Sequence, residues 1–246
     1  MKGYLFFSIL ILFSIISITK PKFLSKEFFS HQSLNYIHLD GNTLKLFLLR
    51  NDYYIIDTRD VTKIAEGYLP NSIIAPLSLF SWLYAVVPES SNVILITDEA
   101  NLETAVDALI KLGKYKLYGY CIFDEINTTS SFNLQVIEYD PNTLESITNI
   151  VNNNGNIIDI REIAEYKDTG VIKEAHLIPL SSFFTNYSNI PKEGNVYVYC
   201  KSGMRAVAGM SYAKRAGYKN KFIIMKGGMN KAIEEGYPLV PYEENY

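Results

Sequence analysis

The sequence has few of the residues that build metal centres and disulfide frameworks. It contains two cysteines and three histidines, and none of them stands in a CxxC, HxxxH or HxH spacing. A disulfide scaffold and a structural zinc site are therefore both poorly supported. No segment gathers the block of Lys and Arg that binds a phosphate backbone, and the formal net charge is −3. We expect no nucleic-acid partner.

The chain is instead rich in apolar and aromatic residues. Hydrophobic residues make up 48% of the 246 residues and aromatic residues 13%. This composition is too apolar for a disordered chain. The length is sufficient for one large or two small folded domains.

The N-terminus has the layout of an export signal. Residues 4–18 are apolar apart from serines and are flanked by Lys2 and Lys20. This run is shorter than the roughly 20 residues that a membrane-spanning helix needs. We therefore expect residues 1–19 to be a signal peptide, with a short membrane anchor or a buried first helix as alternatives. The protein is accordingly predicted to be exported, to the periplasm or as a secreted protein, and attachment to a membrane would occur through this segment.

Two halves of the sequence repeat each other. The matching segments are residues 40–44 and 140–144 at an offset of 100, residues 55–60 and 157–162 at 102, and residues 93–96 and 196–199 at 103. Such slow drift indicates short loop insertions within a tandem duplication. We predict two domains, 36–124 and 136–241, joined by a polar linker at 125–135.

Each half alternates β-branched strands with amphipathic helical segments. This alternation predicts an α/β fold in which each half is a doubly wound, mainly parallel sheet flanked by helices. The clearest unit is a strand at 196–199, a loop at 200–205 and a helix that ends at Ala216, before Gly217.

The loop after the strand at 196–199 carries the candidate chemistry, because ligands of open α/β sheets bind beyond the carboxyl ends of strands. Its residues are Cys200, Lys201, Ser202, Gly203, Met204 and Arg205. A strand-to-helix turn directs backbone amides toward its centre, where they stabilise a thiolate or a bound anion. The loop is therefore the predicted active site.

Cys200 is the candidate nucleophile of this loop. Lys201 and Arg205 would favour its thiolate, and Arg205 offers a planar fork for two oxygens of an anion. Gly203 permits the tight backbone that turns the amides inward. The alternative, a small buried core residue, suits Cys121 better, because apolar and aromatic residues flank that cysteine.

These residues resemble the rhodanese-like sulfurtransferases. The likeness covers both halves, and the first half resembles the non-catalytic rhodanese modules found behind metallo-β-lactamase-fold hydrolases, here without a hydrolase domain. The matching motifs of the second half are Asp159 to Arg161, Glu165, Tyr166, Gly170, Ile178 to Leu180, the loop from Cys200 to Arg205, Lys226 to Gly228, and Gly236 to Pro238.

The resemblance implies two tandem rhodanese-like domains, of which only the second is catalytic. A sulfane sulfur would pass from a small anionic donor such as thiosulfate, through a persulfide on Cys200, to cyanide, a thiol or a protein acceptor. Residues 201–205 would bind the donor, and Asp159 and Arg161 would support the site. No metal or organic cofactor is needed for this chemistry.

The first half departs from the catalytic pattern. Thr97 stands at the nucleophile position, and Asp98 and Glu99 follow where the second half has cationic residues. An anionic donor would be repelled there, and a thiolate is lacking. We expect this half to be inactive.

Two other functions fit parts of the pattern. A non-enzymatic sulfur carrier or interaction module would use the same persulfide without turnover. Cysteine phosphatases and arsenate reductases also use a cysteine loop that ends in arginine, but five residues intervene in their loops. Here only four residues, 201–204, separate Cys200 from Arg205, a ring too small for a tetrahedral oxyanion.

Overall fold

The computed structural model describes residues 36–48, 50, 52–128 and 132–244. The predicted signal or anchor segment, residues 1–19, lies outside them, so its role stays an expectation. Within the described ranges, no helix is both long enough and apolar enough to cross a membrane.

The β-branched runs of the first half form a parallel five-stranded sheet in the order β1-β5-β4-β2-β3. Parallel neighbours require crossover connections, and short helices supply them. The strands are β1 (Ile37–His38), β2 (Tyr53–Asp57), β3 (Ile73–Ile74), β4 (Asn92–Thr97) and β5 (Lys116–Ile122). The helices are α1 (Gly41–Leu48), α2 (Val61–Glu66), α3 (Leu102–Leu112) and α4 (Phe123–Thr128), with the 3₁₀ helices η1 (Leu77–Ala85) and η2 (Glu99–Asn101).

The second half repeats this architecture. Its sheet is also parallel, in the equivalent order β6-β10-β9-β7-β8. The strands are β6 (Glu138–Asp140), β7 (Asn156–Asp159), β8 (His176–Leu177), β9 (Val196–Tyr199) and β10 (Phe222–Met225). The helices are α5 (Leu144–Asn152), α6 (Ile163–Thr169), α7 (Phe183–Asn186), α8 (Met204–Arg215) and α9 (Gly228–Glu234), with η3 (Leu180–Ser182) and η4 (Tyr187–Asn189).

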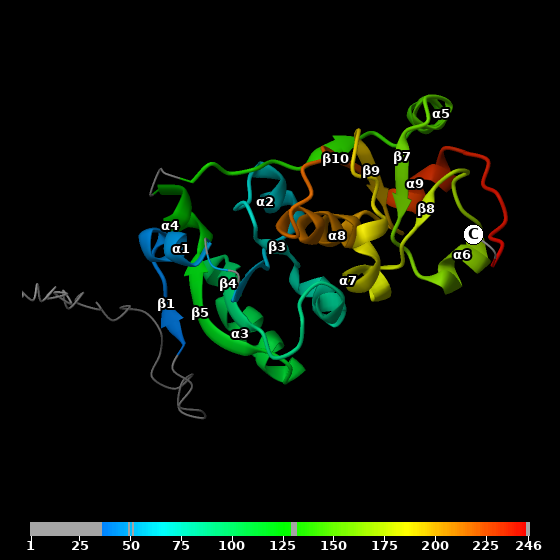
Figure 1. The fold of residues 1–246 in the computed structure, drawn as a ribbon. Helices are drawn as coiled ribbons and strands as arrows, with labels where there is room; N and C mark the ends of the chain where they lie inside the picture. Colours follow the sequence, from blue (N-terminus) through cyan, green and yellow to red (C-terminus); the bar gives the residue numbers. More distant parts are fainter. Residues whose placement is uncertain (1–35, 49, 51, 129–131, 245–246) are drawn as a thin grey trace, which may run out of the picture. The chain divides into compact units, whose positions relative to one another are not determined.

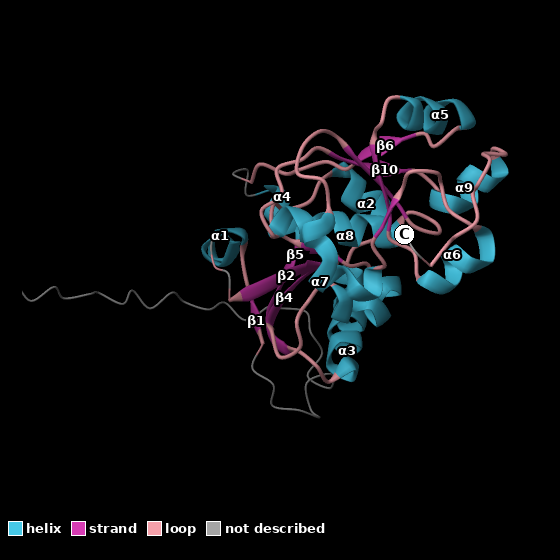
Figure 2. Cartoon of the chain, turned by 45° about the vertical axis from the view of Figure 1, so that its right-hand side comes forward, coloured by secondary structure: helices cyan, strands magenta, loops and turns pink. Residues whose placement is uncertain are grey.

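Helices flank the strands of both sheets (Figure 2). The predicted fold class, two α/β halves with parallel sheets, is therefore confirmed. The segment predicted as a linker starts inside helix α4, where Ile126 is buried in the core of the first half.

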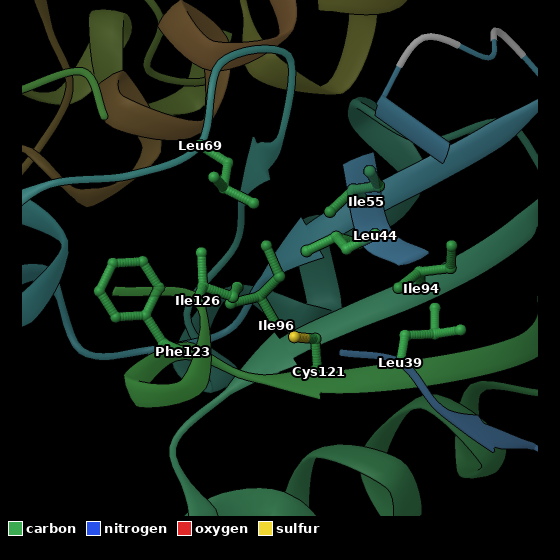
Figure 3. Packing of buried hydrophobic residues seen from close by; sticks show 9 residues of the cluster. All are labelled: Leu39, Leu44, Ile55, Leu69, Ile94, Ile96, Cys121, Phe123 and Ile126. Carbon is green, nitrogen blue, oxygen red and sulfur yellow. The ribbon is translucent and has the colours of Figure 1, made fainter. Parts of the chain in front are cut away.

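A hydrophobic cluster, aliphatic except for Phe123 and Cys121, forms a core of the first half (Figure 3). Burial raises the pKa of the Cys121 thiol to about 12. Its sulfur donates to the carbonyl oxygen of Ile122 at 3.7 Å. The thiol is therefore neutral at physiological pH and acts as a packing residue.

Helix α8 is buried on nearly all sides because it packs against its own sheet and also against β3 of the first half (Figure 1). The backbone amide of Ile74, on edge strand β3, donates to Ser211 Oγ on α8 at 2.9 Å. The first half thus covers the helix that follows Cys200, and α8 in turn covers the edge of the first sheet.

Candidate active site

Strand β9 places Cys200 at its carboxyl end, and α8 starts only four residues later, at Met204. Gly203 adopts φ 101° as the N-cap residue, a left-handed conformation that glycine tolerates. Met204 and Arg205 were expected in the loop, but they belong to the first turn of the helix. The loop proper is therefore tighter than the sequence indicated.

The Cys200 sulfur lies within this tight loop. The backbone amide of Gly203 donates to Cys200 Sγ at 3.1 Å, and the residue is 1% exposed. The positive end of the 12-residue helix α8 starts directly after this contact. A backbone amide and a helix N-terminus both stabilise negative charge on sulfur.

A glycine pair, Gly227 and Gly228, and the two residues that follow it contact the backbone of the loop. The amide of Met229 donates to Cys200 O at 2.8 Å, and the amide of Asn230 donates to Lys201 O at 3.0 Å. A Cβ on Gly228 would overlap the carbonyl oxygen of Cys200, so only glycine fits there. The conformation of the loop therefore depends on the start of α9.

Asn142 secures the glycine pair in turn. Its Nδ2 donates to Lys226 O at 3.0 Å and to Gly228 O at 2.7 Å, and the side chain is 1% exposed. These bonds tie the segment before α5 to the glycine pair, so two stretches of chain outside the loop fix the backbone around Cys200.

Arg205 is paired rather than open. Its NH1 and NH2 donate to Glu165 at 2.6 and 2.7 Å, in a bidentate pair. The guanidinium carbon also lies 5.3 Å from the ring centroid of Trp82, which comes from η1 of the first half. The predicted role of Arg205 in donor binding stays a prediction. Glu165 and Trp82 already contact its guanidinium.

Electrostatics agree with an ionised pair. Burial alone would raise the pKa of Glu165, but the hydrogen bonds from Arg205 and from the Glu162 amide, together with the charges of Arg205 and Arg161, outweigh it and lower that pKa. Burial would lower the pKa of Arg205, yet Glu165 and the nearby Cys200 charge raise it. Both partners are therefore charged at neutral pH.

Asp159 and Arg161 form a buried pair behind the end of β7. Arg161 Nε and NH2 donate to Asp159 Oδ2 at 2.9 and 2.6 Å, and NH2 also donates to Gly170 O at 2.8 Å. Asp57 and Arg59 form the same pair in the first half, which has no cysteine at the equivalent loop. The pair therefore occurs in both halves, and the supporting role of Asp159 and Arg161 at the site stays a prediction.

The equivalent loop of the first half is built differently. Thr97 is fully buried, and the following residues form the 3₁₀ turn η2 instead of a glycine turn. The amide of Asn101 donates to Asp98 O at 3.0 Å, and the Asp98 carboxylate pairs with Lys63 at 3.1 Å. The first half therefore has carboxylates, Asp98 and Glu99, at the positions that follow the cysteine in the second half.

The predicted site residues differ in their exposure to solvent. Lys201 and Ser202 are exposed, Met204 is half-buried, and Cys200, Gly203 and Arg205 are buried. Sequence reasoning assigned no role to Glu165 or Trp82, although Glu165 belongs to a matching motif and Trp82 is the single tryptophan. Glu165 and Trp82 lie 40 and 123 positions from Arg205 in the sequence. No pattern among neighbouring residues could therefore have predicted these two contacts.

No cluster of three or more His, Cys, Asp or Glu that could hold a metal occurs among the described ranges. A cavity of about 530 Å³ lies at the amino ends of β7 and β9, the opposite end of β9 from Cys200. Asparagines dominate its lining, and the loop residues take no part in it.

Comparison with known proteins identifies a family. The rhodanese-like domain family matches residues 143–235. A protein named sulfurtransferase from Allochromatium vinosum is 32% identical over 87 residues, which cover 35% of this chain and 79% of that protein.

Two solved structures are also similar. The rhodanese-related protein of Thermoplasma volcanium is 23% identical, with a TM-score of 0.38, over 43% of this chain and 99% of that chain. The thiosulfate sulfurtransferase of Pseudomonas aeruginosa is 17% identical, with a TM-score of 0.36, over 84% of this chain and 44% of that chain.

Proposed function

The chain belongs to the rhodanese-like family, and we propose that it is a sulfurtransferase whose nucleophile is Cys200. The observation that carries this proposal is the Gly203 amide donating to Cys200 Sγ at 3.1 Å, at the N-terminus of α8. This arrangement supports a thiolate and, after transfer, an anionic terminal sulfur.

The reaction proceeds by double displacement. The Cys200 thiolate attacks the outer sulfur of a donor such as thiosulfate, a new S–S bond forms, and the donor's own S–S bond breaks to release sulfite. The electron pair of the broken bond leaves with sulfite. A thiol, cyanide or a protein acceptor then removes the terminal sulfur and regenerates the Cys200 thiolate.

The tight loop disfavours phosphate-ester chemistry. A phosphatase needs a ring of free amides and an arginine open to equatorial oxygens. Here α8 begins at Met204, which shortens the loop, and Glu165 occupies the Arg205 guanidinium. A single transferred sulfur demands less room and fewer donors.

A mass measurement tests the nucleophile. Incubation with a sulfane-sulfur donor is expected to add one sulfur atom to the wild-type chain and none to Cys200→Ser. Cys121→Ser is the matched control, because that thiol lies in the core and keeps its proton. Sulfur gain by Cys200→Ser would overturn the proposal, and steady-state turnover with cyanide separates an enzyme from a sulfur carrier.

A further inference from the structure

The Arg205 guanidinium is occupied on two sides. Glu165 takes one edge through two hydrogen bonds of 2.6 and 2.7 Å. The Trp82 ring covers a face at 5.3 Å, and Arg205 is 9% exposed. The planar fork that would bind two donor oxygens therefore already binds two carboxylate oxygens.

This pairing changes the charge that a donor meets. The positive charge of Arg205 is cancelled by Glu165, and the cation that the loop presents to solvent is Lys201, whose side chain is exposed. In the proposed reaction the attacking group is the Cys200 thiolate, whose negative charge also opposes an anionic donor. A dianion entering this site must therefore overcome more repulsion than a monoanion does.

We propose that Glu165 determines donor specificity, so that the site selects monoanionic organic sulfane-sulfur compounds over dianionic thiosulfate. This inference rests on the proposed function and names its substrate class. In such a donor an organic group replaces one charged oxygen. The donor then carries one negative charge fewer, and it can bind without a guanidinium that is free to neutralise the second charge.

The transfer step balances for this class. With a thiosulfonate, R–SO₂–S⁻, the Cys200 thiolate attacks the outer sulfur, and a new S–S bond forms on Cys200. The donor S–S bond breaks, and its electron pair leaves with the sulfinate R–SO₂⁻. No oxidant, reductant or proton is consumed, and the total charge is the same on both sides.

Two donors of similar size isolate the charge effect. Methanethiosulfonate differs from thiosulfate by a methyl group in place of one oxygen and carries one negative charge fewer. We would measure kcat/KM for both donors in the full-length wild type and in Glu165→Gln. The ratio between the two proteins cancels the intrinsic reactivities of the donors.

Glu165→Gln keeps an oxygen that accepts from the Glu162 amide, as Glu165 Oε2 does at 2.9 Å, but it removes the negative charge that cancels Arg205 and one of the two oxygens that accept from Arg205. We expect kcat/KM for thiosulfate relative to methanethiosulfonate to rise about tenfold, mainly through KM, because one unit charge near the site is removed. Glu89→Gln removes the same charge from an exposed pair with Lys114 in the first half and is expected to leave the ratio unchanged.

A ratio that stays within twofold in folded Glu165→Gln would overturn the inference. Should that variant fail to fold, the wild type alone decides: inhibition by sulfate, a dianion, is expected to be weaker than inhibition by methanesulfonate, and the reverse order would overturn the inference. Failure of the proposed function is distinct, because the wild-type chain would then gain no sulfur from either donor.

Discussion

At residue scale, the lack of a Cβ on Gly228 leaves room for the backbone of the loop that holds Cys200. Its backbone has φ 60°, and a Cβ there would overlap Cys200 O. Gly113 has nearly the same φ, 63°, but faces open space. An alanine at Gly113 would therefore cause backbone strain alone, whereas an alanine at Gly228 would also collide with the loop.

We predict that Gly113→Ala lowers the free energy of unfolding by about 1–2 kcal/mol, the cost of a left-handed alanine, with no effect on sulfur transfer. Gly228→Ala should destabilise more and should abolish persulfide formation, because the Cys200 carbonyl must move. Denaturant unfolding and intact mass after donor incubation measure both effects. Equal behaviour of the two variants would show that Gly228 does not support the loop.

At the scale of elements, the loops after β4 and β9 occupy equivalent places in two sheets of the same strand order. Gly203 bends the β9 loop so that its amide reaches sulfur, whereas the β4 loop closes into η2. Side-chain charge differs as well, since Asp98 and Glu99 replace Lys201 and Ser202. The fold alone therefore does not create the site.

We predict that a cysteine placed in the β4 loop stays inactive. Thr97→Cys made in the Cys200→Ser background should gain no sulfur from a donor, because Asp98 and Glu99 disfavour a thiolate and the loop closes into η2 instead of a glycine turn. The matched control is Cys200 in the wild-type chain under the same conditions. Persulfide on the introduced cysteine would mean that strand-end geometry outweighs these carboxylates.

At the scale of the whole described chain, α8 joins the two halves. Ser211 accepts from the Ile74 amide at 2.9 Å and donates to Ala208 O at 2.8 Å. Arg215 NH2 donates to Tyr53 O at 2.8 Å, and its guanidinium lies 4.4 Å from the Tyr54 ring centroid. The first half thus packs against the helix whose first turn follows the Cys200 loop.

We predict that Ser211→Ala lowers the free energy of unfolding by about 1–3 kcal/mol, because the buried Ile74 amide loses its acceptor. Ser72→Ala is the matched control: Ser72 is equally buried and donates to Leu69 O at 2.7 Å, but that carbonyl keeps the Ser72 amide as a donor. Denaturant unfolding compares the variants. A larger loss in Ser72→Ala would show that the Ile74–Ser211 bond contributes little.

The sequence by itself determined the features that depend on neighbouring residues. Offsets near 100 predicted two equivalent halves, the alternating run at Val196–Tyr199 matched β9, and the loop after it was identified from Cys200 and Gly203. Periodicity and turn residues carry such information because they act within a few positions. The start of α8 was misplaced, because Gly203 ends the loop before Met204 and Arg205.

Only the tertiary structure decided what surrounds Arg205. Its partner Glu165 comes from α6 and its aromatic neighbour Trp82 from η1 of the other half. The sequence places Arg205 five residues after Cys200, which indicated a guanidinium free to bind an anion. Whether that guanidinium is free depends on which carboxylate the fold brings against it, and here Glu165 does so. Contacts between distant segments arise from packing of elements, and no local pattern of residues encodes them.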